Sequence, residues 1–274
     1  MKNRKLIILA VVIVTLLVVI LIFSLGTEKA EPVAKTGSIS SASAASDLDQ
    51  ARLLQSKGDF IAAGDIYRRL IEDFPASGQI SDWQNKITEL NIKILFSPEI
   101  TAESTTYKIK SGDSLEKIAK KFGTTVELLK KSNGFSDDKI YTGQEIKVWT
   151  APFSLLVDKS QNMMILKSNE EVFKTYIVAT GEDNSTPVGI FYIVEKLTNP
   201  TWYRAGAVIP PDSPDNVLGT RWLGFDLSGY GIHGTTEPES LGKQVTQGCV
   251  RLSNADVEEL YIIIPKGTEV TIVD

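Results

Sequence analysis

The chain has very few of the residues that form metal sites and disulfides. Its 274 residues contain one cysteine, Cys249, and one histidine, His233. One cysteine excludes an intrachain disulfide, and one Cys with one His is a poor zinc ligand set without a carboxylate cluster, so we expect no metal and no cofactor. The excess of basic residues needed to bind nucleic acid is also missing, since the net charge is −4 over residues 47–105, +3 over 107–149 and −7 over 153–274.

One long apolar run is present at the N-terminus. Leu6 to Leu25 is uncharged and has the ~20 residues that span a bilayer, and Lys2, Arg4 and Lys5 precede it. A cleaved signal peptide has a shorter apolar region followed closely by a small-x-small site, which this run lacks. We therefore expect residues 1–28 to be a cytoplasmic tip and a single-pass anchor, with the rest of the chain exported to the periplasm or cell-wall space.

The segment after the anchor changes from small residues to helical periodicity. Residues 29–46 are mostly small and polar, which indicates a flexible linker. Residues 47–98 place apolar side chains at helical spacing, with Gly58 and Pro75 between three helices. This spacing resembles one tetratricopeptide repeat, and a segment of that kind would dock a protein partner. One repeat leaves open the alternative of a helical hairpin that acts as a spacer or packs onto its neighbours.

The pattern of residues 106–150 predicts the order strand, helix, helix, strand. Apolar residues alternate at both ends, and Ser111 or Ser114 begins the first helix. The segment resembles a LysM module, a family that binds N-acetylglucosamine-containing glycans. The runs that carry this resemblance are Gly112-Asp113-Ser114-Leu115, Ile118-Ala119, Asn133-Gly134 and Gly143-Gln144.

The LysM resemblance implies a shallow glycan groove beside the first loop and the loop after the second helix. Its candidate residues are Gly112, Asp113, Ser114, Leu115 and Asn133. Turns of this kind offer neutral backbone hydrogen bonds to a polyhydroxylated ligand. The structural alternative is that Gly112-Asp113 only caps a helix, and both roles are compatible.

Residues 153–274 are rich in strands and contain one helix. The strands are expected at residues 153–157, 163–167, 172–179, 190–195, 222–226 and 269–273. Ser253 or Asn254 begins the helix, with Asp256 as the capping-box acid. We expect a β-sandwich or barrel-like domain that carries this helix.

The same domain contains Cys249 and His233, both within residues 233–251. A nucleophilic thiol needs a base, and Gly248 allows a tight turn that points the sulfur and amide groups at one spot. The alternative is an inert buried thiol. Export disfavours that alternative, because structural cysteines pair in oxidising compartments. The pair therefore predicts acyl transfer through a thioester.

This domain resembles the YkuD-type L,D-transpeptidases. The runs that carry the resemblance are Thr186-Pro-Val-Gly-Ile-Phe191, Asn199-Pro-Thr-Trp202, Asn216-Val-Leu-Gly219, Ile232-His233-Gly234 and Thr246-Gln-Gly-Cys-Val-Arg251. The family cleaves the bond between the third residue and the terminal D-alanine of a peptidoglycan tetrapeptide. It holds the remainder as a thioester and passes it to an amine.

The resemblance assigns roles by position. Cys249 becomes the nucleophile and His233 the general base and acid, with the backbone at Gly234 holding its tautomer. Amide groups around Gly248 and Cys249 would stabilise the oxyanion. We also expect an imidazolium partner to lower the thiol pKa by several units.

Five further residues are candidates for the catalytic or substrate site. Arg251 would bind a substrate carboxylate or, equally, form a structural ion pair. Thr246 would hydrogen-bond near the thiol, and Gln247 stands where many members have a second histidine, so His233 acts alone. Trp202 and Tyr203 lie in a long Pro-rich segment, as part of a lid over the cleft or of the core.

These patterns predict a multidomain chain with an N-terminal transmembrane helix, a short α-helical segment, an α+β LysM module and a mostly-β L,D-transpeptidase domain. The predicted function is peptidoglycan cross-linking, with glycan strands and stem peptides as partners and no nucleic acid. Two other classes stay open: a non-catalytic peptidoglycan-binding scaffold, and an L,D-carboxypeptidase with water as acceptor. A protein lysine is a further candidate acceptor.

Overall fold

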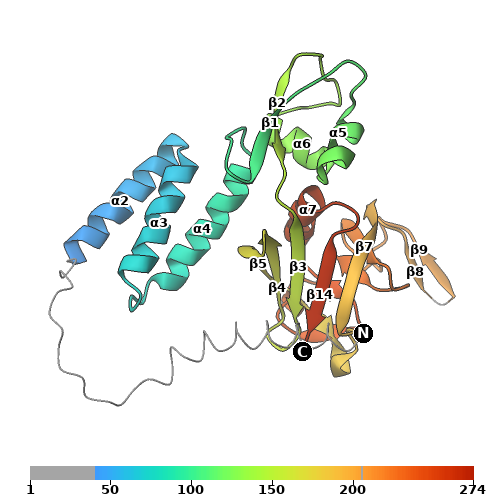
Figure 1. Cartoon of the computed structure of the whole chain (residues 1–274). Coiled ribbons are helices and arrows are strands. Elements are labelled where there is room, and N and C mark those ends of the chain that lie inside the picture. Colours follow the sequence, from blue (N-terminus) through green and yellow to red (C-terminus); the bar gives the residue numbers. More distant parts are fainter. Residues whose placement is uncertain (1–40, 205) are drawn as a thin grey trace, which may run out of the picture. The chain divides into compact units, whose positions relative to one another are not determined.

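The computed structural model describes residues 41–204 and 206–274, which form the three expected modules in chain order (Figure 1). The anchor predicted for residues 1–28 lies outside these residues. Among the helices described, none has the length and apolar character needed to cross a membrane.

The helical segment consists of α2 (Ser41–Lys57), α3 (Phe60–Asp73) and α4 (Ile80–Leu95). Three helices were predicted, but α2 begins before residue 47, so the expected linker 29–46 is wrong at its C-terminal end. Its Ser-Ala composition suggested a loop, yet alanine is the best helix former, and Ala44 packs against the helical core.

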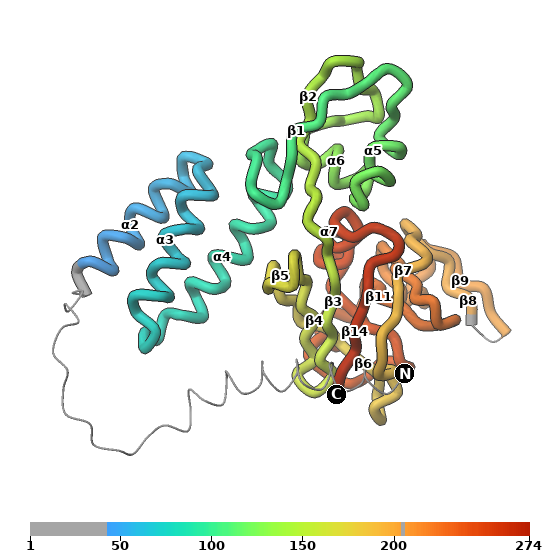
Figure 2. The backbone as a smooth tube through the Cα atoms, viewed as in Figure 1, coloured from blue at the N-terminus to red at the C-terminus, as the bar shows by residue number. Residues whose placement is uncertain are grey.

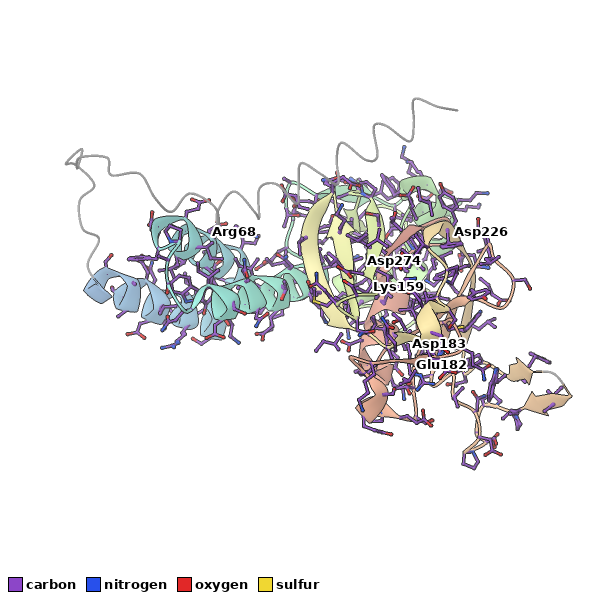
Figure 3. The ribbon with its side chains drawn as sticks, turned by 90° about the horizontal axis from the view of Figure 1, so that it is seen from below. Arg68, Lys159, Glu182, Asp183, Asp226 and Asp274 are labelled. Carbon is purple, nitrogen blue, oxygen red and sulfur yellow. The ribbon has the colours of Figure 1, made fainter. Side chains whose placement is uncertain are left out.

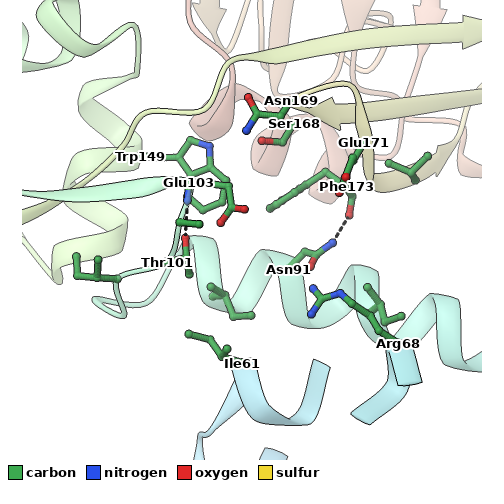
Figure 4. Close-up of a pocket in the computed structure, with 15 residues that line it drawn as sticks. Ile61, Arg68, Asn91, Thr101, Glu103, Trp149, Ser168, Asn169, Glu171 and Phe173 are labelled. Carbon is green, nitrogen blue, oxygen red and sulfur yellow. Dashed lines mark hydrogen bonds between the residues drawn. The ribbon is translucent and has the colours of Figure 1, made fainter. Parts of the chain in front are cut away.

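The helical segment also packs onto the domain that follows the LysM module, which was one of the alternatives to a tetratricopeptide repeat. Asn91 Nδ2 of α4 donates to Phe173 O of strand β5 (Glu171–Ile177) at 3.0 Å. A cavity of about 530 Å³ lies at this junction, and Trp149 and Phe173 contribute to its wall (Figure 4). Neither Cys249 nor His233 lines this cavity. A protein partner of the helical segment stays a prediction.

The second module has the predicted order, with β1 (Ser104–Lys108), α5 (Leu115–Phe122), α6 (Val126–Asn133) and β2 (Glu145–Trp149). The two strands pair antiparallel. Ser114, not Ser111, caps α5, because its hydroxyl accepts from Lys117 N at 3.3 Å. Thr125 caps α6 and its hydroxyl also donates to Ile262 O, which joins this module to the catalytic domain.

The catalytic domain contains one eight-stranded mixed sheet in the order β13-β11-β10-β7-β14-β3-β4-β5. Its strands are β3 (Phe153–Asp158), β4 (Met163–Ser168), β5, β7 (Gly189–Thr198), β10 (Arg221–Phe225), β11 (Gly231–His233), β13 (Val250–Arg251) and β14 (Glu269–Val273). The C-terminal strand β14 joins the two halves, since it pairs parallel to β3 and antiparallel to β7 (Figure 2).

The six predicted strands are all present, together with the predicted helix α7 (Asn254–Ile263), which Ser253 caps. The short strands were missed, namely β6 (Thr180–Gly181), β8 (Trp202–Arg204), β9 (Ala207–Ile209), β11, β12 (Gln244–Thr246) and β13. Two or three residues are too few to show alternation, so their pairing depends on tertiary structure.

A buried lysine, Lys159, holds the loop formed by residues 181–186. Lys159 is 2% exposed, and its Nζ lies 2.8 Å from Asp274 Oδ1 and donates to Thr186 O at 2.9 Å (Figure 3). Thr186 Oγ1 in turn accepts from Gly181 N at 2.7 Å. Because a hydrogen bond from a charged donor is strong, the bond from the buried Lys159 to Thr186 and the bond between Thr186 and Gly181 hold the 181–186 loop in place.

Candidate active site

Parallel pairing of β11 with β13 brings the only cysteine and the only histidine of the chain together. Ile232 is opposite Val250 and His233 is opposite Arg251, and Cys249 directly precedes β13. Side chains alternate between the two faces of a sheet. Since Ile232 and Val250 are fully buried in the core, His233, Cys249 and Arg251 belong to the other face.

The hydrogen bonding of His233 sets its tautomer. The ring is 3% exposed, and Nδ1 lies 2.7 Å from Gly234 O, the contact expected at this position. A carbonyl can only accept, so Nδ1 carries the proton and Nε2 is left as an acceptor. Burial lowers the pKa of His233 to about 4, which makes the imidazole neutral at pH 7.

The thiol of Cys249 is half-buried between backbone groups of the β10–β11 turn. Its Sγ–H donates to Gly229 O at 3.6 Å. Burial raises the thiol pKa above its usual value, while the Gly231 N–H and the charge of Arg251 act in the opposite direction. The expected drop of the thiol pKa is therefore wrong. Desolvation disfavours both ions, so the resting pair is a neutral thiol and a neutral imidazole.

The turn before Cys249 requires glycine at position 248. Gly248 has φ +122, and a Cβ there would lie 2.7 Å from Tyr230 Cε1 and 3.2 Å from Ser185 O. Both the backbone conformation and the missing space exclude a side chain. The close packing of Tyr230 and Ser185 therefore determines where the cysteine sits.

Thr246 shapes the same turn. Its hydroxyl is buried, donates to Cys249 O at 2.7 Å and accepts from Gly248 N at 3.2 Å. The Gly248 amide, which we expected to serve the oxyanion, is thus already engaged. Gln247 is exposed on the outside of the turn.

Trp222 is a site residue that sequence reasoning missed. Its indole stacks on the His233 ring, with centroids 6.0 Å apart and planes 22° apart, and its Nε1–H donates to Glu195 Oε2 at 3.0 Å. A Cβ at Gly224 or Gly231 would lie 2.7 or 2.9 Å from the indole, so both glycines make room for it. The signal in the sequence was an aromatic residue opposite the histidine across a tight hairpin.

Arg251 forms the structural ion pair. Its Nη1 lies 2.8 Å from Glu237 Oε2 and donates to Ser240 Oγ at 3.0 Å. Arg251 is only 7% exposed, and the charge of its guanidinium adds to the effect of burial in lowering the pKa of His233. Binding of a substrate carboxylate stays a prediction.

The predicted lid residues lie on the β8–β9 hairpin. Tyr203 is 74% exposed, so it is not part of the core, and Trp202 is partly buried. Asn216 holds the base of this hairpin by donating to Pro200 O at 2.9 Å. The hairpin extends away from the main sheet in Figure 1, and its action as a lid stays a prediction.

The candidate glycan residues are mostly committed to the module itself. Asp113 Oδ2 accepts from Lys110 N and Tyr107 OH, and these bonds hold its pKa below the usual value. Leu115 is 1% exposed in the module core, so its side chain cannot contact a ligand. Asn133 ties α6 to Lys147 of β2 in both directions, at 2.9 and 2.7 Å. The carbonyl of exposed Gly112 also accepts from Lys117 Nζ at 2.7 Å, and the carbonyl of Ser114 accepts from Ile118 N at 3.0 Å. Glycan binding by this set stays a prediction.

Metal ligands are not clustered in the part of the chain that the structure describes: no three His, Cys, Asp or Glu side chains converge there. The donor set at the site is one imidazole and one thiol, at adjacent strands of the same sheet. The arrangement therefore fits nucleophilic chemistry by a thiol with a neutral base.

Comparison with known proteins agrees with this geometry. Residues 152–272 match the L,D-transpeptidase catalytic domain (YkuD), and residues 107–149 match the LysM domain. The putative L,D-transpeptidase YkuD of Bacillus subtilis is 36% identical over 174 residues, which cover 61% of this chain and 98% of that protein.

Two partial similarities extend the comparison. The probable peptidoglycan endopeptidase LytE of Bacillus subtilis is 63% identical over 43 residues, 16% of this chain and 13% of that protein. A crystal structure of an L,D-transpeptidase from Mycobacterium tuberculosis aligns with 48% of this chain and 63% of its own, at 17% identity and a TM-score of 0.40.

Proposed function

The chain belongs to the YkuD family of L,D-transpeptidases, and on that premise we propose how its residues cross-link peptidoglycan. Cys249 attacks the carbonyl carbon of the third residue of a tetrapeptide stem while His233 Nε2 takes the thiol proton. The tetrahedral intermediate then breaks its bond to D-alanine, whose amine receives that proton from His233. The product of this half-reaction is a thioester on Cys249.

The second half-reaction reverses these proton movements. An amine attacks the thioester carbonyl and gives a proton to His233, and the sulfur leaves and recovers that proton. The new amide joins two stems. The observation that carries this course is that the Gly234 carbonyl keeps the proton of His233 on Nδ1, which leaves Nε2 ready to accept.

The raised thiol pKa favours proton transfer during the attack over a preformed thiolate. Because the Gly248 N–H is bonded to Thr246, we assign the stabilisation of the oxyanion to the Cys249 N–H. A second donor would have to move into place when the substrate binds. Trp222 faces the imidazolium that forms transiently, and its ring stabilises a cation.

The LysM module would hold the enzyme on its polymeric substrate. The support is the match over residues 107–149 and the exposed loop after α6, where Tyr141 is 70% exposed. Since Thr125 and Leu128 of this module contact the catalytic domain, binding of a glycan would place stem peptides near a fixed surface of the enzyme.

The location is proposed from the sequence. The apolar run Leu6–Leu25 after Lys2, Arg4 and Lys5 supports a membrane anchor with the modules on the extracytoplasmic side. A cysteine without a partner for a disulfide is compatible with export when it is a reactive thiol.

The decisive experiment is intact-mass spectrometry of the protein with tetrapeptide muropeptides, beside Cys249→Ala. A Cys249-dependent thioester, D-alanine release and dimers joined between third residues are expected. Release of one D-alanine per enzyme without dimers would mean that an acceptor is missing, whereas release over many turnovers without dimers would identify water as the acceptor. Absence of any adduct, with glycan binding retained, would support a scaffold.

A further inference from the structure

A hydrogen-bonded chain runs from the catalytic imidazole through one peptide unit to a half-buried side-chain amide. His233 Nδ1–H donates to Gly234 O at 2.7 Å. The same peptide unit carries Thr235 N–H, which donates to Asn254 Oδ1 at 3.2 Å. Hydrogen bonds at both ends of a peptide polarise it and strengthen one another.

Asn254 is held so that its oxygen must face this peptide. Its Oδ1 also accepts from Thr220 N at 3.1 Å, and its Nδ2 donates to Thr235 O at 2.9 Å. The two roles cannot be exchanged by flipping the amide, because that would set an NH₂ group against two N–H donors. Asn254 opens helix α7, which packs on β10 and β11, so the core sets its position.

Two neighbouring glycines leave the space that the Asn254 side chain occupies. A Cβ at Gly219 or Gly234 would collide with Asn254 Oδ1. Gly219 also has φ +64, whereas Gly234 is not among the residues with positive φ. At Gly234 the missing side chain therefore serves the close approach of Asn254, not a special backbone conformation.

We propose that Asn254 is a positioning residue of the active site, which orients and polarises the Gly234–Thr235 peptide so that its carbonyl holds His233 in the Nδ1–H tautomer. The inference rests on the proposed function. In triads with a carboxylate, that group contacts the imidazole directly. Here a peptide stands between the imidazole and the residue that orients it.

Several other charged or titratable groups face His233 and stay unchanged in the variants below. Arg251 of β13 and the thiol of Cys249 lie on the same sheet face, Glu237 pairs with Arg251, and Glu195 reaches the ring through Trp222. The Gly234 carbonyl raises the pKa of His233 against the effect of burial. Loss of its orientation should lower that pKa further.

The test uses ¹⁵N NMR of the imidazole in full-length protein, because His233 is the sole histidine and gives unambiguous ring signals. In the parent protein we expect the Nδ1–H tautomer. Asn254→Ala should give a mixture of tautomers, a lower titration midpoint, and a kcat/KM reduced about 10- to 100-fold, the size of effect known for outer hydrogen-bond partners of metal-ligating histidines. Asn254→Asp keeps both accepted bonds and adds negative charge, so its midpoint should rise above that of the parent.

Asn216→Ala is the matched control. Asn216 is another side-chain amide bonded to backbone groups in this domain, and it is buried. Its loss should lower Tm without moving the tautomer or the midpoint. The proposal is overturned if folded Asn254→Ala keeps the parent tautomer and midpoint, or if Asn254→Asp leaves the midpoint in place. The NMR readout does not depend on turnover, so failure of the proposed function would appear separately. In that case Asn254→Ala would still change the tautomer of His233, but the parent protein would show no acyl transfer.

Discussion

Replacement of Gly248 by alanine is the most direct test of how the nucleophile is placed. The new Cβ would meet Tyr230 Cε1 at 2.7 Å and Ser185 O at 3.2 Å, at a residue with φ +122. Backbone strain of this kind costs about 1–3 kcal/mol, and overpacking adds about 1–3 kcal/mol. We expect Gly248→Ala to lower the free energy of unfolding by about 2–6 kcal/mol.

The same change should displace the thiol. A misplacement of about 1 Å at a reacting group can cost about 100-fold in rate, so we expect kcat to fall by about that factor even in folded protein. Denaturant unfolding measures the stability, and thioester formation with a tetrapeptide measures the rate. The two assays separate loss of fold from loss of geometry.

Gly267→Ala is the control for backbone strain alone. Gly267 has φ +90, and a Cβ there meets nothing within 4 Å. It should lose about 1–2 kcal/mol and keep its acylation rate. In Gly248→Ala, truncation of Tyr230 to Ala should recover part of the rate by relieving the collision. Equal stability and equal rates for Gly248→Ala and Gly267→Ala would refute the reasoning.

Three further predictions concern the base, its aromatic neighbour and the glycan module. The acid limb of the kcat/KM profile should lie near pH 4, because His233 must be neutral to accept the proton. The rate of Cys249 alkylation should keep rising with pH above the usual range of thiol pKa values, whereas a plateau of that rate at neutral pH would indicate a preformed thiolate. Trp222→Leu should lower kcat about 2- to 30-fold, the loss of about 0.5–2 kcal/mol of cation–π stabilisation, with a smaller effect for Glu195→Gln, and equal effects of the two would contradict this assignment. Tyr141→Ala should weaken binding to insoluble peptidoglycan and leave kcat on short muropeptides unchanged, whereas a parallel loss of both would place Tyr141 outside a glycan site.

Local patterns were sufficient for most elements. The alternation of apolar residues predicted the six longer strands, and Ser114 and Ser253 lie at the helix starts that the capping pattern indicated. The scarcity of cysteine and histidine singled out Cys249 and His233 before any geometry was known. These features depend on neighbours in sequence, and so the sequence carries them directly.

Long-range pairing decided the rest. The parallel contact of β11 with β13 involves strands of three and two residues, and the insertion of β14 between β3 and β7 joins the ends of the domain. Trp222 enters the site only because β10 lies antiparallel to β11. Such short strands have no pattern of their own, since their free energy comes from the sheet they complete.

The sequence by itself determined the chemistry of this protein: one thiol, one imidazole, and Gly248, which allows the turn before the thiol. Only the tertiary structure decided how that chemistry runs. Burial raises the pKa of Cys249 and lowers that of His233, Thr246 occupies an amide expected to be free, and Asn254 reaches the base through a peptide. Desolvation and hydrogen-bond partners depend on what surrounds a group in space, and the order of residues along the chain does not state it.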